Sequence, residues 1–145
     1  MRSLSLRFVD EGRAHRPVLA RTAVLRWLRA ALDGADFEIA VRVVGEAEGL
    51  ALNADHRDGD HATNVLTFAY AEEPAVVADI VLCAPVVERE AVAAAVPLEA
   101  HYAHLVVHGA LHAQGHDHGN DTDAARMEAR ESAILTRLGY PDPWA

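Results

Sequence analysis

Residues 101–118 have the sequence HYAHLVVHGALHAQGHDH, and this stretch holds six of the nine histidines of the chain. His108 and His112 are four residues apart, so a helix would place both imidazoles on one face, close enough to bind one ion. Gly115 allows the chain to leave that helix in a left-handed conformation, and the turn can return His118 to the same ion. The sequence therefore predicts one zinc-type metal ion per chain, held by His108, His112 and His118.

Three imidazoles around zinc leave one tetrahedral position for water, which is the arrangement of a catalytic zinc rather than of a structural one. Zinc lowers the pKa of such a water to roughly 7, so hydroxide is available at neutral pH. The histidine spacing therefore predicts a hydrolytic centre in which the metal-bound water takes part in the reaction.

The helix that carries the first two ligands has two different sides. One side is apolar and consists of Val106, Val107, Ala110 and Leu111. The other side carries an arc of histidines, His101, His104, His108 and His112. We expect the apolar side to pack on the core and the histidines to line a cleft. Since His101 and His104 lie one to two turns from the ligands, we interpret them as cleft lining and not as ligands.

Outside this stretch, segments with the spacing of apolar residues that is typical of strands alternate with segments that have the spacing typical of helices. Strands are expected over residues 4–8, 37–44, 63–69 and 76–83. Helices are expected from Pro17 to about Gly34, over 46–57, over 88–112 with an interruption at Pro97, and over 122–138. This order predicts a single α+β domain spanning residues 1–145, with helices packed on a small mixed four-stranded sheet and the metal site at the end of a central helix.

The composition is that of a globular protein, with 51% hydrophobic and 24% charged residues in 145. No apolar run approaches the ~18 residues that a membrane span needs. The N-terminal residues are too charged for the apolar core of a signal peptide. Cys83 is the single cysteine, which excludes an intrachain disulfide and agrees with a reducing compartment. We therefore expect a cytoplasmic protein without membrane contact, and a buried, unreactive Cys83.

The net charge of -9 excludes a generally basic protein that coats phosphates. The chain has no lysine, however, and seven of its thirteen arginines fall within the first 29 residues. Arginine pairs with phosphate in a planar, bidentate manner. Arg26 and Arg29 are thus candidates for a local phosphate-binding surface, and an ordinary solvated face is the open alternative.

The spacing of the three histidines also matches the metzincin peptidases. Those enzymes need a glutamate directly after the first histidine as the general base, and here that position is Gly109. A glycine has no side chain to take a proton, so peptide hydrolysis by that mechanism is disfavoured.

The run His108-Gly-x-Leu-His112-x-x-Gly-x-Asp-His118 resembles the signature of the YbeY-type bacterial endoribonucleases. The resemblance extends over roughly residues 37–144. Similar blocks are residues 52–57 with Asp60, residues 63–68, the strand Ala78-Asp79-Ile80, and the closing helix with Met127-Glu128, Glu131, Ile134-Leu135 and Leu138-Gly139. Three positions depart from the family pattern, His56, Asn64 and His116.

This resemblance implies zinc-dependent cleavage of single-stranded RNA in the maturation of the 3′ end of 16S ribosomal RNA and in ribosome quality control. It also implies the small ribosomal subunit and assembly factors as partners. Arg57 would then bind the substrate and neutralise charge that grows on the phosphate in the transition state. The alternative for Arg57 is a helix-terminal arginine that bonds the last carbonyl groups.

Asp117 and His116 are candidate helpers in catalysis. Asp117 could act as a base or only orient a ligand imidazole, and His116 could shuttle protons or serve only as a stacking ring. Two other hypotheses stay open on the sequence alone. One is a non-catalytic, metal-stabilised ribosome-assembly factor, and the other is a different metallohydrolase such as a peptidase.

Overall fold

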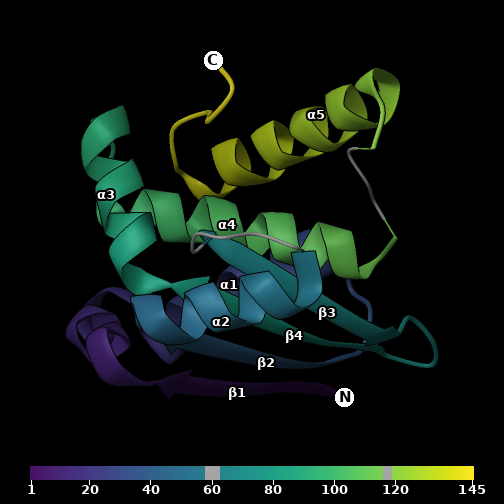
Figure 1. Cartoon of the computed structure of the whole chain (residues 1–145). Helices are drawn as coiled ribbons and strands as arrows, with labels where there is room; N and C mark the ends of the chain where they lie inside the picture. The colour runs from purple at the N-terminus through teal and green to yellow at the C-terminus, as the bar shows by residue number, and fades with distance from the viewer. Residues whose placement is uncertain (58–62, 116–118) are drawn as a thin grey trace.

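The structure is a computed structural model that describes residues 1–57, 63–115 and 119–145, except for the side chains of residues 54–57. Figure 1 shows a sheet with helices on both faces. The elements are β1 (Arg2–Phe8), the 3-10 helix η1 (Asp10–Val18), α1 (Arg21–Leu32), β2 (Phe37–Val44), α2 (Glu46–Arg57), β3 (Val65–Ala71), β4 (Val76–Cys83), α3 (Ala84–Ala94), α4 (Leu98–Ala113) and α5 (Asp121–Leu138).

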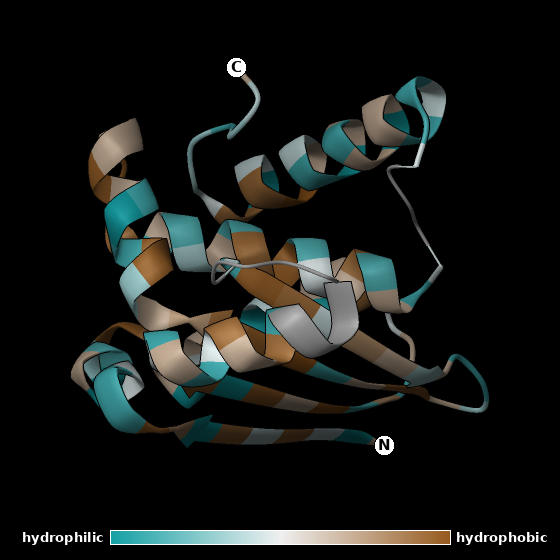
Figure 2. Cartoon of the chain, in the orientation of Figure 1, coloured by the Kyte–Doolittle hydropathy of each residue, from teal (hydrophilic) through white to brown (hydrophobic). Residues whose placement is uncertain are grey.

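The sheet has the strand order β1-β2-β4-β3. β1, β2 and β4 run parallel, and β3 pairs antiparallel with β4 at one edge. Hydrophobic and hydrophilic residues alternate along β1 (Figure 2), which gives this strand two different faces. The predicted α+β class and the small mixed sheet of four strands are therefore confirmed.

Helix α4 occupies the centre of the molecule. It packs on β3 and β4 and also contacts α1, α3 and α5. In Figure 1, α5 lies on the side of α4 that faces away from the sheet. The other face of the sheet is partly covered by α2, whose Leu52 packs against Val44, Leu66 and Val81. The helix that was expected to carry the metal site is thus central, as predicted.

The helix expected from Pro17 begins later, at Arg21. Pro17 belongs to η1, which the sequence pattern did not reveal. The chain leaves helical geometry at Leu19, whose side chain is inserted into the core, and Ala20 is extended and exposed at the start of α1. Proline is compatible with the first turn of an α-helix and also occurs in η1. Pro17 therefore did not show whether the sequence forms one helix or η1 followed by α1.

Helix α3 begins at Ala84, directly after β4, and not at Glu88. Pro85 in its first turn is compatible with this early start, since the missing N–H has no partner in the first turn of a helix. The interruption at Pro97 is confirmed, because Pro97 is the residue that precedes α4. Cys83 is buried as predicted, and burial raises the pKa of its thiol. Within the described ranges, no helix combines the length and apolar character needed to cross a membrane.

Candidate metal centre

Helix α4 presents its two sides as the sequence predicts. The apolar residues Val106, Val107, Ala110 and Leu111 are buried, and the four histidines of the arc are partly exposed. The ring centroids of His108 and His112 lie 5.7 Å apart. Gly115, just beyond the helix, has a φ of 89°, which is the predicted left-handed exit from α4. Two of the three predicted ligands thus lie next to each other in the last two turns of α4.

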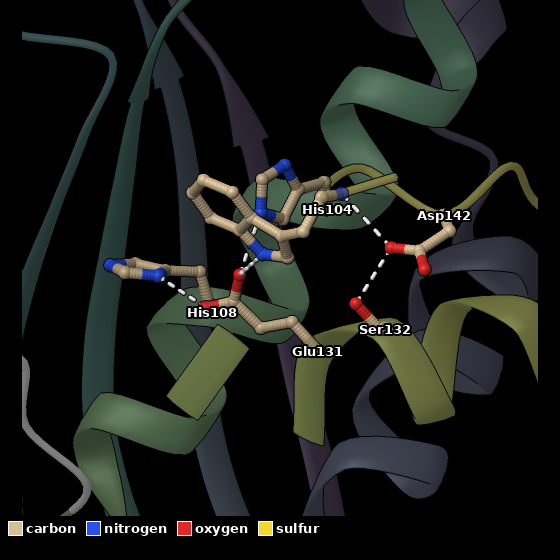
Figure 3. A network of polar contacts seen from close by, with 6 residues as sticks. His104, His108, Glu131, Ser132 and Asp142 are labelled. Carbon is tan, nitrogen blue, oxygen red and sulfur yellow. Dashed lines mark hydrogen bonds and ion pairs between the residues drawn. The ribbon is translucent and has the colours of Figure 1, made fainter. Parts of the chain in front are cut away.

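Glu131 of α5 lies between His104 and His108 (Figure 3). Its Oε2 atom is 2.6 Å from His108 Nδ1, and its Oε1 atom is 2.8 Å from His104 Nε2. The side chain is only 1% exposed. Burial disfavours the charged carboxylate, but the hydrogen bonds from His104 and His108 outweigh it and lower the pKa of Glu131 to about 2. Glu131 is therefore ionised at neutral pH.

An ionised carboxylate can only accept hydrogen bonds, so the facing nitrogens of both histidines carry the protons. In a neutral ring, His108 then has its proton on Nδ1 and a lone pair on Nε2. Histidines that bind zinc commonly donate their other N–H to a carboxylate in this way. His108 thus offers a nitrogen lone pair, and the imidazole of His112 lies beside it. Two neighbouring imidazoles of this kind fit a zinc ion.

The third predicted ligand, His118, lies outside the described residues, as do the candidate helpers Asp117 and His116. In the part of the chain that is described, no three or more His, Cys, Asp or Glu side chains gather in a group that could hold an ion. The complete ligand set therefore stays a prediction. The same holds for the role of Arg57, since the structure describes its backbone at the end of α2 but not its side chain.

The two histidines interpreted as cleft lining contact carboxylates of neighbouring helices. His101 Nε2 is 2.8 Å from Glu90 Oε1 of α3, and Asn64 Nδ2 donates to the same oxygen over 2.9 Å. His104 is held by Glu131 of α5. These contacts tie α4 to α3 and α5.

Arg26 of α1 contacts the C-terminal end of α5. It donates to the Leu138 carbonyl and to the Tyr140 hydroxyl, both over 3.2 Å, and its guanidinium carbon lies 5.8 Å from the centroid of the Tyr140 ring. Arg29, on the same helix, is exposed. Arg26 thus has a structural role in joining two helices, and phosphate binding by either arginine remains a prediction.

Sequence reasoning missed Glu131 and Trp144 as parts of this site. The Trp144 indole Nε1 donates to Glu131 Oε1 over 2.9 Å, so a residue near the C-terminus reaches the same carboxylate as the histidines. A signal for Glu131 did exist, because it lies within the buried stripe of α5 formed by Met127, Ile134 and Leu135. A charged residue in such a stripe needs buried partners.

Gly109 faces the sheet and not the histidine arc. A Cβ atom at this position would lie 3.0 Å from Thr67 Oγ1 and 3.2 Å from Ile80 Cδ1. The glycine therefore allows α4 to approach the strands closely. A glutamate at the position that metzincin peptidases use for their general base would meet β3 and β4 here, which gives a physical reason to disfavour that mechanism.

We expect the substitution Gly109→Glu to lower the free energy of unfolding by roughly 3 kcal/mol or more, because it forces a charged side chain into the tight contact between α4 and the sheet. Urea denaturation measures this change. The substitution Ala125→Glu, at an exposed position of α5, is the matched control and should change the free energy little. A stable Gly109→Glu protein would contradict the close packing of α4 on Thr67 and Ile80.

Comparison with known proteins finds similar sequences and a similar fold. A family model described as "Endoribonuclease YbeY" matches residues 9–139. A protein of Methylibium petroleiphilum named "Endoribonuclease YbeY" is 62% identical over 142 residues, which cover 98% of this chain and 93% of that protein. A protein of the same name from an Acidovorax species is 59% identical and covers 99% of this chain and 95% of its own length. Among solved structures, the solution structure of TM1509 from Thermotoga maritima matches with a TM-score of 0.67 at 26% identity, covering 93% of this chain and 88% of that one.

Proposed function

The chain belongs to the endoribonuclease YbeY family and is a hydrolase of RNA phosphodiester bonds, and we propose that it cleaves single-stranded RNA with the help of one zinc ion. Its substrate in this proposal is 16S ribosomal RNA, whose 3′ end it matures, and it also serves ribosome quality control. The observation that carries the zinc proposal is the pair His108 and His112, with His108 held by the buried carboxylate of Glu131.

His108, His112 and His118 would hold the metal in this proposal. When bound, zinc would polarise a water molecule and a phosphoryl oxygen of the substrate. Glu131 holds the proton of His108 on Nδ1, which would leave Nε2 of His108 available to bind the ion. Arg57 would bind the scissile phosphate, and Asp117 or His116 would assist proton transfer. Because the chain carries a net charge of -9, its contacts with RNA phosphates must be local and few.

The partners in this proposal are the small ribosomal subunit and its assembly factors, and the location is the cytoplasm. The non-catalytic assembly factor and the peptidase lose support. The named relatives are endoribonucleases. At position 109, the close packing on the sheet leaves no room for the glutamate that a peptidase would need. Endoribonuclease activity is the function that both the family and the donor chemistry favour.

We expect the zinc-loaded protein to cut single-stranded RNA, to spare DNA of the same sequence, and to leave unfolded proteins intact. DNA is spared because it lacks the 2′-hydroxyl by which proteins distinguish RNA. Cleavage should weaken as salt rises, since phosphate contacts release counterions. The measurement combines metal analysis of the pure protein with gel assays on the three substrates. Cleavage of a casein-like substrate without cleavage of RNA would reject the proposal.

A further inference from the structure

The Glu131 carboxylate collects N–H donors from two separate parts of the chain. His104 and His108 reach it from α4, and the Trp144 indole reaches it from the segment that follows α5. We propose that Glu131 is a positioning residue of the metal centre and that Trp144 holds it in place, so that the C-terminal segment influences zinc affinity through His108. This inference rests on the zinc site of the proposed function.

The three donors divide unequally between the two carboxylate oxygens. Oε1 accepts from His104 Nε2 over 2.8 Å and from Trp144 Nε1 over 2.9 Å, whereas Oε2 accepts from His108 Nδ1 over 2.6 Å. The two donors at Oε1 fix the rotation of the carboxylate, which leaves Oε2 directed at His108. The orientation and the tautomer of His108 therefore depend on contacts that do not involve His108 itself.

Trp144 is anchored by contacts of its own. Its backbone N–H donates to Asp142 Oδ1 over 2.9 Å, and the Ser132 hydroxyl donates to the same oxygen over 2.6 Å (Figure 3). The indole also meets the His104 ring edge to face, with centroids 5.6 Å apart. Although Trp144 is 49% exposed, its indole N–H is directed at a buried carboxylate. The end of the chain is thus tied both to α5 and to the histidine arc.

The substitution Glu131→Gln tests the positioning role with a side chain of the same shape. A glutamine offers one acceptor oxygen and one donor amide in place of two acceptors. Two N–H groups, from His104 and Trp144, meet one carboxylate oxygen, and His108 meets the other. The glutamine oxygen therefore takes the place between His104 and Trp144, and the amide N–H turns toward His108. His108 must then accept at Nδ1 and carry its proton on Nε2, the nitrogen that the metal needs.

We expect two results for Glu131→Gln. In the metal-free protein, nitrogen NMR of labelled histidines should show that His108 loses its Nδ1–H form, which the wild-type protein holds. Zinc affinity, measured by competition with a chromogenic chelator, should fall roughly 10- to 100-fold, the usual effect of losing such a partner. A merely structural carboxylate would change the melting temperature but not the tautomer of His108.

Trp144→Phe is the second variant and covers the case that Glu131→Gln does not fold. Phenylalanine keeps an aromatic ring against His104 but removes the indole N–H. We expect zinc affinity to fall roughly 2- to 10-fold, the scale of one hydrogen bond. Unchanged zinc affinity in this variant would overturn the role of Trp144.

The matched control is Glu90→Gln, since Glu90 also pairs with a histidine of α4, contacting Nε2 of His101. It should leave both the tautomer of His108 and zinc affinity unchanged. If the wild-type protein binds zinc, and Glu131→Gln retains the Nδ1–H form and the same affinity, the positioning role is wrong. If the wild-type protein binds no zinc, the zinc site of the proposed function fails, and the inference about zinc affinity falls with it. The tautomer measurement then still shows whether Glu131 positions His108.

Discussion

The zinc content of the purified protein should fall from about one ion per chain to a small fraction of that value when His112 is replaced by alanine. Three imidazoles hold zinc because each supplies a lone pair, and two cannot retain it against water. RNA cleavage should fall by roughly 10³-fold or more, since the metal supplies several kcal/mol of transition-state stabilisation. Metal analysis of protein prepared without chelators and a gel assay of RNA cleavage measure the two effects.

The other histidines of the stretch serve as comparisons for this experiment. His108→Ala and His118→Ala should lose zinc in the same way, whereas His116→Ala and His101→Ala should retain it. His101 is the matched control, because it lies on the same helix and also contacts a carboxylate, through Nε2 where His108 uses Nδ1. Stoichiometric zinc in the His118→Ala protein would refute the assignment of three ligands.

Three elements could be predicted from the sequence to the residue. The strands at 37–44 and 76–83 and the helix at 46–57 have the expected bounds. The two misplaced helix starts share a physical cause. At both Pro17 and Pro85, proline is compatible with more than one local geometry. The start of α1 is decided by the burial of Leu19, and the start of α3 is decided by the end of β4.

The candidate site shows the same division between local and distant information. His108 and His112 could be predicted because residues four apart always share a helix face. Glu131, the partner of His108, lies 23 residues from it, and Trp144 lies 13 residues beyond Glu131. Only the packing of α5 on α4 brings them together, and this packing cannot be predicted from the spacing of residues along the chain. A charged residue within a buried stripe is a sequence feature that could have pointed to the role of Glu131.

The second large effect is expected for Arg57→Ala. Arg57 is the last residue of α2, and the sequence continues with Asp58, Gly59 and Asp60. Attack on a phosphate builds negative charge that one metal ion offsets only in part. A guanidinium held at that position would stabilise the transition state more than the bound substrate. RNA cleavage should therefore fall by roughly 10²-fold, the scale of about 3 kcal/mol for one preorganised contact. Zinc content and melting temperature should stay nearly unchanged.

Two further variants make this expectation specific. Arg57→Lys should restore cleavage only in part, because an ammonium group lacks the bidentate geometry of a guanidinium. Arg89→Ala removes an exposed arginine paired with Glu46 at the start of α2, and it should leave cleavage unchanged, since such surface pairs add little to stability. The opposite result is equally clear. If Arg57 only bonds the last carbonyl groups of α2, the Arg57→Ala protein melts at a lower temperature while its folded fraction cleaves RNA at the normal rate. That result would remove Arg57 from the catalytic machinery and leave the metal centre to act without it.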